Sequence, residues 1–73
     1  MSSMIKVTLS ENLKLLMKEN SLTQEQLSKR IGISQSAISA WLAGKKEPKI
    51  ISLWKLADEF NITIDELLGR ESF

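Results

Sequence analysis

The sequence predicts an all-α domain, a compact bundle of five helices, and two observations lead to this prediction. Apolar residues recur at spacings of three and four instead of alternating, which is typical of helices with one buried face. The 73 residues include three glycines and one proline, too few for a chain rich in turns. We therefore expect short connections between the helices and no strand.

The first helix is expected over residues 10–19. Ser10 could act as its N-cap, because a serine hydroxyl can accept a hydrogen bond from an amide of the first turn. Asn20 and Ser21 are expected to end it. Four apolar side chains at helical spacing would form its buried face: Leu9, Leu13, Leu16 and Met17.

The second and third helices are separated by a turn of about three residues. Thr23 and Gln26 have the spacing of a capping box, and Gly32 stands where a left-handed residue would end the second helix. Ser34 can then cap a third helix that stops at Gly44. The inward-facing side chains of these two helices would be Leu27, Ile31, Ala37, Ile38, Trp41 and Leu42.

Two further helices are expected after the loop that contains the proline. The fourth covers roughly residues 52–59, and Asn61 can adopt the left-handed conformation at its end. Thr63 and Glu66 repeat the capping-box spacing and open a short fifth helix that ends near Gly69. The side chains of the fourth helix that would face inward are Leu53, Leu56, Ala57 and Phe60.

The composition excludes several classes of function. The chain has no cysteine and no histidine, which removes disulfides, thiolate chemistry, most zinc sites and the commonest general base. Its late carboxylates, which include Asp58 and Asp65, have no nucleophile or metal ligand beside them, so we expect no enzyme, cofactor, metal or small-molecule ligand. No apolar run approaches the roughly 20 residues of a membrane span, and no signal peptide is evident, so a cytoplasmic protein is expected.

The net charge of +1 hides an uneven distribution along the chain. Residues 1–28 carry three charges of each sign. Residues 29–55 carry six cations and one anion, a balance of +5, and the remainder carries one cation and five anions, a balance of −4. Such asymmetry is typical of a protein that turns one face toward a polyanion. The alternative is a solvated face that happens to be rich in lysine.

Two helices joined by a short turn that contains glycine are typical of the helix-turn-helix motif, here at about residues 24–43. Ser28 supplies the small side chain needed where the two helices cross. The outward positions that could enter a major groove are Gln35, Ser36, Ser39 and Ala40. For the last three, ordinary solvated surface is the alternative.

Residues 22–48, LTQEQLSKRIGISQSAISAWLAGKKEP, resemble the DNA-binding domains of the phage Cro and lambdoid repressor family. The likeness consists of the TQ pair, a small residue and a glycine four apart, the SQxxIS stretch, and a tryptophan followed by glycine and proline. The segment LWKLADEFNITIDELL is similar to the last two helices of the family. The resemblance implies a lambda repressor-like domain over residues 9–69, with residues 1–8 and 70–73 as flexible termini.

The resemblance also implies a function, namely sequence-specific binding of double-stranded DNA by a transcriptional regulator, most often a repressor, with the third helix in the major groove. Gln24 matches the family's glutamine that binds a backbone phosphate and braces the first side chain of the third helix, here Gln35. The resemblance makes Gln35 the strongest candidate for reading a base, since its amide matches N6 and N7 of adenine. Amides after Thr23 and Ser34, at the starts of two helices, could also receive a phosphate. Three lysines occupy the loop with which relatives grip phosphates: Lys45, Lys46 and Lys49.

Relatives often dimerise near their last helices, which implies a homodimer on a palindromic operator. The matching candidates for the subunit contact are Trp54, Ile64, Leu68 and Phe73. The alternative function is an antitoxin or protein-interaction module with the same fold, which would present a contiguous apolar patch including Trp54 and Phe73. Many relatives also continue into a larger regulatory domain, and the chain ends where such a linker would begin.

One position pair departs from the family. Many relatives have an arginine in the first helix and a glutamate late in the third, which form a partly buried ion pair. The matching residues here are Met17 and Leu42. We expect these two apolar side chains to contact each other, because well-packed apolar groups can replace a buried ion pair without loss of stability.

Overall fold

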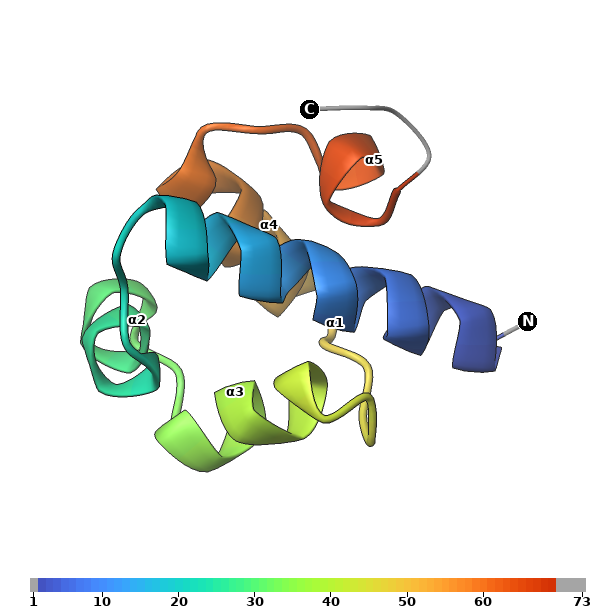
Figure 1. Ribbon diagram of the computed structural model, residues 1–73, viewed down its shortest axis with the longest axis horizontal. Coiled ribbons are helices and arrows are strands. Elements are labelled where there is room, and N and C mark those ends of the chain that lie inside the picture. The colour runs from blue at the N-terminus through green and yellow to red at the C-terminus, as the bar shows by residue number, and fades with distance from the viewer. Residues whose placement is uncertain (1, 70–73) are drawn as a thin grey trace.

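Five α-helices make up the part of the chain that the structure describes. The computed structural model describes the backbone of residues 2–69 and the side chains of residues 8–69. The helices are α1 (Ser2–Glu19), α2 (Gln24–Ile31), α3 (Gln35–Leu42), α4 (Ile50–Phe60) and α5 (Ile64–Leu67). Helix α1 crosses the middle of the molecule between α3 and α5, and α2 packs against α3 and α4 (Figure 1). The all-α, five-helix prediction is confirmed for residues 2–69.

The predicted start and stop signals form as expected at α2, α3 and α5. The Thr23 and Thr63 hydroxyls accept hydrogen bonds from Gln26 N at 3.1 Å and Glu66 N at 3.0 Å, and both capping boxes are complete. Ser34 caps α3 by accepting from the amide of Ala37. Asn61 ends α4 in the left-handed conformation, with φ of 56°. The capping bonds at the starts of these helices give partners to amides that would otherwise be unpaired.

The start of α1 corrects the prediction. The helix begins at Ser2, so it includes residues that the sequence placed in a flexible N-terminal segment, and Ser10 is not an N-cap. Ser10 is instead buried in the middle of α1 and donates its hydroxyl hydrogen bond to the carbonyl of Leu42. A serine usually favours helix ends because its hydroxyl competes for nearby backbone groups. Here the hydroxyl has a partner on another helix, and no glycine or proline precedes it to stop the helix.

One apolar cluster holds the five helices together. Trp41, predicted to lie in the core, is 5 % exposed. Met17 is buried in the cluster and Leu42 packs against it, so both side chains lie in one apolar environment instead of pointing into solvent. The buried members of the cluster are Leu9, Leu13, Leu16, Met17, Leu27, Ile31, Ile38, Trp41, Leu56 and Leu67. Full burial of one such leucine contributes about 1.5–3 kcal/mol, which is how a domain without disulfides can be stable.

Helix α4 is longer than the predicted 52–59 and begins at Ile50. Its N-cap, Lys49, makes no side-chain capping bond, which explains why no start signal marked this end. Helix α5 has the predicted start and ends at Leu67. Among the described residues, no helix is long and apolar enough to cross a membrane, and no cluster of side chains could hold a metal ion.

Gly69 lies where the end of α5 meets α1. Its φ is +83°, and a Cβ built on it would lie 2.3 Å from Cγ2 of Thr8. Gly32 has a similar φ of +68°, but a Cβ there would meet nothing within 4 Å. A substitution at Gly32 would therefore cause backbone strain alone, whereas a substitution at Gly69 would cause backbone strain and a steric conflict.

We predict that Gly69→Ala destabilises the domain more than Gly32→Ala. The left-handed conformation costs an alanine about 1–2 kcal/mol at either position, and overpacking against Thr8 adds about 1–3 kcal/mol at residue 69 alone. Urea unfolding followed by circular dichroism measures both losses. Equal losses would contradict the close approach of α5 to α1.

Candidate nucleic-acid interface

The turn between α2 and α3 is held by hydrogen bonds that fix the relation of the two helices. Gly32 adopts the predicted left-handed conformation, and its amide donates to Ser28 O at 2.9 Å. The Ser28 hydroxyl then donates to Ile33 O at 2.5 Å and closes the turn. From the sequence, Ser28 was singled out only because its side chain is small. Its hydroxyl has an equally direct role, since it satisfies a carbonyl that the turn leaves without a helical partner.

Helix α3 divides into a buried face and an exposed face. Ile38 is fully buried and Trp41 nearly so, and together they anchor the helix on the core. The opposite face carries Gln35, Ser36 and Ser39, all exposed, whereas Ala40 is half-buried. The four predicted base-facing positions thus lie outside the core, with the methyl group of Ala40 the least accessible.

The N-terminal end of α3 is better suited to an anion than that of α2. Positive partial charge gathers at the N-terminal end of each of these helices. The first turn of α2, however, contains the exposed carboxylate of Glu25, which lies 4.0 Å from the ammonium of Lys29. The first turn of α3 contains no acidic residue, and Ser36 Oγ lies 3.3 Å from Ser34 Oγ there. Ser36 therefore borders the phosphate-favouring end of α3 as well as its outer face.

Gln24 and Gln35 occupy equivalent places, each being the first residue of its helix. Gln24 is half-buried and Gln35 is exposed. Among the described side chains no hydrogen bond joins these two, so the bracing contact that the resemblance implies stays a prediction for a complex with DNA.

The lysine loop, residues 45–49, leaves α3 through a tight C-terminal cap. Gly44, with φ of 70°, lets its own amide donate to Trp41 O at 3.1 Å and the next amide, of Lys45, donate to Ala40 O at 2.9 Å. The chain therefore turns back at once and keeps the start of the loop beside the end of α3. Lys45, Lys46 and Lys49 are exposed, and neither ion pair found among the described side chains involves them.

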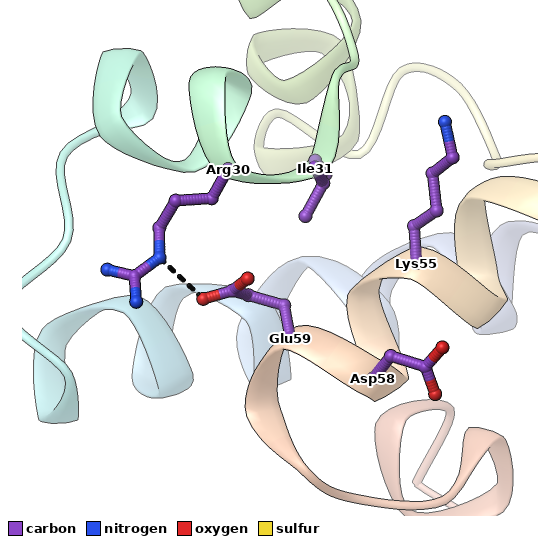
Figure 2. A pocket seen from close by; sticks show the side chains of 5 residues that line it. All are labelled: Arg30, Ile31, Lys55, Asp58 and Glu59. Carbon is purple, nitrogen blue, oxygen red and sulfur yellow. Dashed lines mark ion pairs between the residues drawn. The ribbon is translucent and has the colours of Figure 1, made fainter.

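A shallow cleft lies between the end of α2 and α4 (Figure 2). Within it the guanidinium of Arg30 forms an ion pair with Glu59, with Nε and Oε2 2.6 Å apart. The other side chains that line the cleft are Ile31, Lys55 and Asp58. The ion pair links α2, the first helix of the motif, to α4. Arg30 and Glu59 are far apart in the sequence, and no local sequence pattern predicts that they meet.

The predicted subunit contacts differ in their exposure. Trp54 is 60 % exposed, whereas Ile64 and Leu68 are half-buried and Leu68 packs against the core of its own chain. Phe73 lies outside the described residues. Ile50 and Ile51, which the sequence did not single out, are each 58 % exposed and lie one helical turn from Trp54. Their spacing was visible in the sequence, but the predicted helix began two residues too late to include them.

Comparisons with known proteins agree with this geometry. Residues 13–67 match the helix-turn-helix family HTH_3, which is more than half of the chain. The chain is 44 % identical over 62 residues to the HTH-type transcriptional activator BcrR of Enterococcus faecalis, covering 85 % of this chain and 30 % of that protein. It is 42 % identical over 48 residues to the cryptic phage CTXphi transcriptional repressor RstR of Vibrio cholerae, covering 66 % of this chain and 43 % of the repressor.

A solved structure shares the fold. The crystal structure of an HTH_3 family transcriptional regulator from Vibrio cholerae superimposes with a TM-score of 0.85 at 22 % identity, over 97 % of this chain and 40 % of that one. The chain thus spans less than half the length of each of these three proteins. Because that match covers residues 13–67, the chain belongs to the HTH_3 family of helix-turn-helix proteins, and both curated relatives are transcriptional regulators.

Proposed function

We propose that this domain reads a specific double-stranded DNA sequence by placing α3 in the major groove, and that it does so as a transcriptional repressor. The observation that carries this proposal is the division of α3 into a buried face and an exposed face with Gln35, Ser36 and Ser39. A helix fits the major groove, and short polar side chains near its N-terminus can approach base edges there.

The phosphate contacts assigned to this interface come from three places around α3. The first is the N-terminal end of α3 itself, capped by Ser34 and without an acidic side chain in its first turn. The second is Gln24 with Thr23 at the start of α2. The third is the lysine loop, where Lys45, Lys46 and Lys49 are exposed and outside the ion pairs described above. Such contacts set the register on the duplex and make affinity depend on salt.

Repression is the mode we favour, by the likeness to a phage repressor. A domain that only occupies DNA can repress by blocking access, whereas activation requires a further contact with the transcription machinery. The relative that is an activator is more than three times as long as the segment matched here. We therefore assign occupancy of DNA to this domain and no activating contact.

A second copy of the chain is the partner we propose on the DNA. The α4 patch, consisting of Ile50, Ile51 and Trp54, is exposed and directly follows the lysine loop. Lys49 precedes the patch and Asp58 follows it, so two α4 helices packed antiparallel would bring opposite charges together at both ends. A stable interface takes about 20–30 residues a side, and this patch is far smaller. We propose that the homodimer forms mainly on a palindromic operator.

We predict that Gln35→Ala relaxes sequence preference without abolishing DNA binding. Loss of one bidentate base contact costs about 1–3 kcal/mol at the position that it reads. Selection from a pool of random duplexes, followed by sequencing, gives the preferred operator of the parent protein and of the variant. Preference should weaken at one position in each half-site. Identical motifs for both proteins would remove Gln35 from base reading, and no motif for the parent would overturn specific binding.

We predict that Lys45→Ala and Lys46→Ala weaken binding to all duplexes alike. The slope of log affinity against log salt is negative, and each removed phosphate contact should make it less negative by about 1. Fluorescence anisotropy at several salt concentrations, with the selected operator and an unrelated duplex, measures the slope. Lys14→Ala is the control, because it removes the same charge from the exposed side of α1. If the slope changes as much in the control, the effect of Lys45 and Lys46 comes from the net charge of the protein alone.

We predict that Trp54→Ala abolishes cooperative binding to the full operator and leaves binding to an isolated half-site unchanged. The control is Leu15→Ala, which shortens another exposed apolar side chain, 46 % exposed on α1. Gel-shift titrations of half-site and full-site duplexes distinguish one bound copy from two. Unchanged cooperativity would exclude a second copy at the α4 patch and favour the protein-interaction alternative.

A further inference from the structure

The C-terminal end of α3 is completed by a side chain from another helix. Its last carbonyls cannot find partners within the helix itself. The amides of Lys45 and Gly44 reach the carbonyls of Ala40 and Trp41. The next carbonyl, that of Leu42, receives its hydrogen bond from the hydroxyl of Ser10 on α1, 32 residues earlier in the chain.

This hydrogen bond lies inside the protein. Ser10 is 6 % exposed and Leu42 is half-buried against the apolar cluster. A hydroxyl and a carbonyl in such a place depend on each other, since water cannot easily replace either partner. The bond therefore resists any movement of the last turn of α3 away from α1.

Serine hydroxyls thus hold the turn before α3 and the last turn of α3 itself. At the turn before it, Ser28 donates to Ile33 O, and at its end Ser10 donates to Leu42 O. A helix of eight residues has about two turns. A tilt at one end therefore displaces Gln35 and Ser39, and it also moves the lysine loop that starts three residues after Leu42.

We propose that Ser10 is a positioning residue for DNA recognition. Its hydroxyl sets the angle of α3 and the start of the lysine loop, so that base contacts and phosphate contacts are made together. The proposal rests on the function proposed above, in which α3 reads DNA. Because Ser10 itself is buried, it would act through the position of α3 and not through a contact with DNA.

The neighbouring Asn12 provides a matched comparison. Its amide donates to Leu67 O at 2.9 Å and Glu66 O at 3.4 Å, so the same helix completes the end of α5 by the same kind of bond. None of the proposed DNA contacts lies on α5. Asn12→Ala therefore removes a comparable hydrogen bond while leaving α3 in place.

The test compares Ser10→Ala, Ser10→Cys and Asn12→Ala with the parent, at a temperature where circular dichroism shows each protein fully folded. Affinity is measured for the selected operator and for an unrelated duplex. We expect Ser10→Ala to lower the ratio of the two affinities about tenfold, the size of one lost base contact. Ser10→Cys, with a similar shape and a weaker donor, should lie between the parent and Ser10→Ala. The ratio for Asn12→Ala should equal that of the parent.

Amide hydrogen exchange of the protein without DNA supplies the second readout. Ser10→Ala should speed exchange at Gly44 and Lys45, whose amides close the end of α3, and Asn12→Ala should speed exchange at Gly69, whose amide donates to Glu66 O. A ratio that falls equally in both alanine variants, or exchange at Gly44 unchanged by Ser10→Ala, would overturn the positioning role. If the parent selects no operator, the proposed function fails and the role of Ser10 with it, whereas a parent operator with an unaffected Ser10→Ala ratio overturns Ser10 alone.

Discussion

The burial of Ile38 and Trp41 is the interaction on which the arrangement of the interface depends. A helix of eight residues is not stable in water by itself. Helix α3 therefore exists because these two side chains enter the cluster shared with α1 and α2. Their burial also decides which side chains remain outside, so the same contact that stabilises α3 presents Gln35 and Ser39 to solvent. The stability of α3 and the exposure of its polar face therefore have one physical origin.

Sequence reasoning predicted the features that are determined locally. A capping box is a relation between residues three apart, and the left-handed Gly32 is a property of one residue, so both were predicted correctly. The buried stripes followed from helical spacing, and Trp41 was placed in the core on that basis. The faces of α3 were predicted in the same way, since the buried and exposed positions of one helix follow from a period of 3.6 residues.

The features that were not predicted join residues far apart in sequence. Ser10 was interpreted as an N-cap because a serine hydroxyl can accept a hydrogen bond from a first-turn amide, whereas its actual partner is a carbonyl on α3. The ion pair between Arg30 and Glu59 likewise requires knowing how α2 packs on α4. Helix α4 has no side-chain cap, and its early start, which exposes Ile50 and Ile51, went unpredicted for that reason.

The capped starts of α2, α3 and α5 also bear on how fast the chain folds. Each cap is formed by residues three apart, so the first turn of each helix can form transiently before the helix is packed. Neighbouring helices are joined by short connections, so bringing them together closes only short loops. Domains dominated by such local contacts fold in about microseconds to milliseconds. The hydrogen bonds of Ser10 and Asn12 join residues 32 and 55 positions apart, so forming them closes far longer loops than a cap does and requires α1 to be packed against α3 and α5.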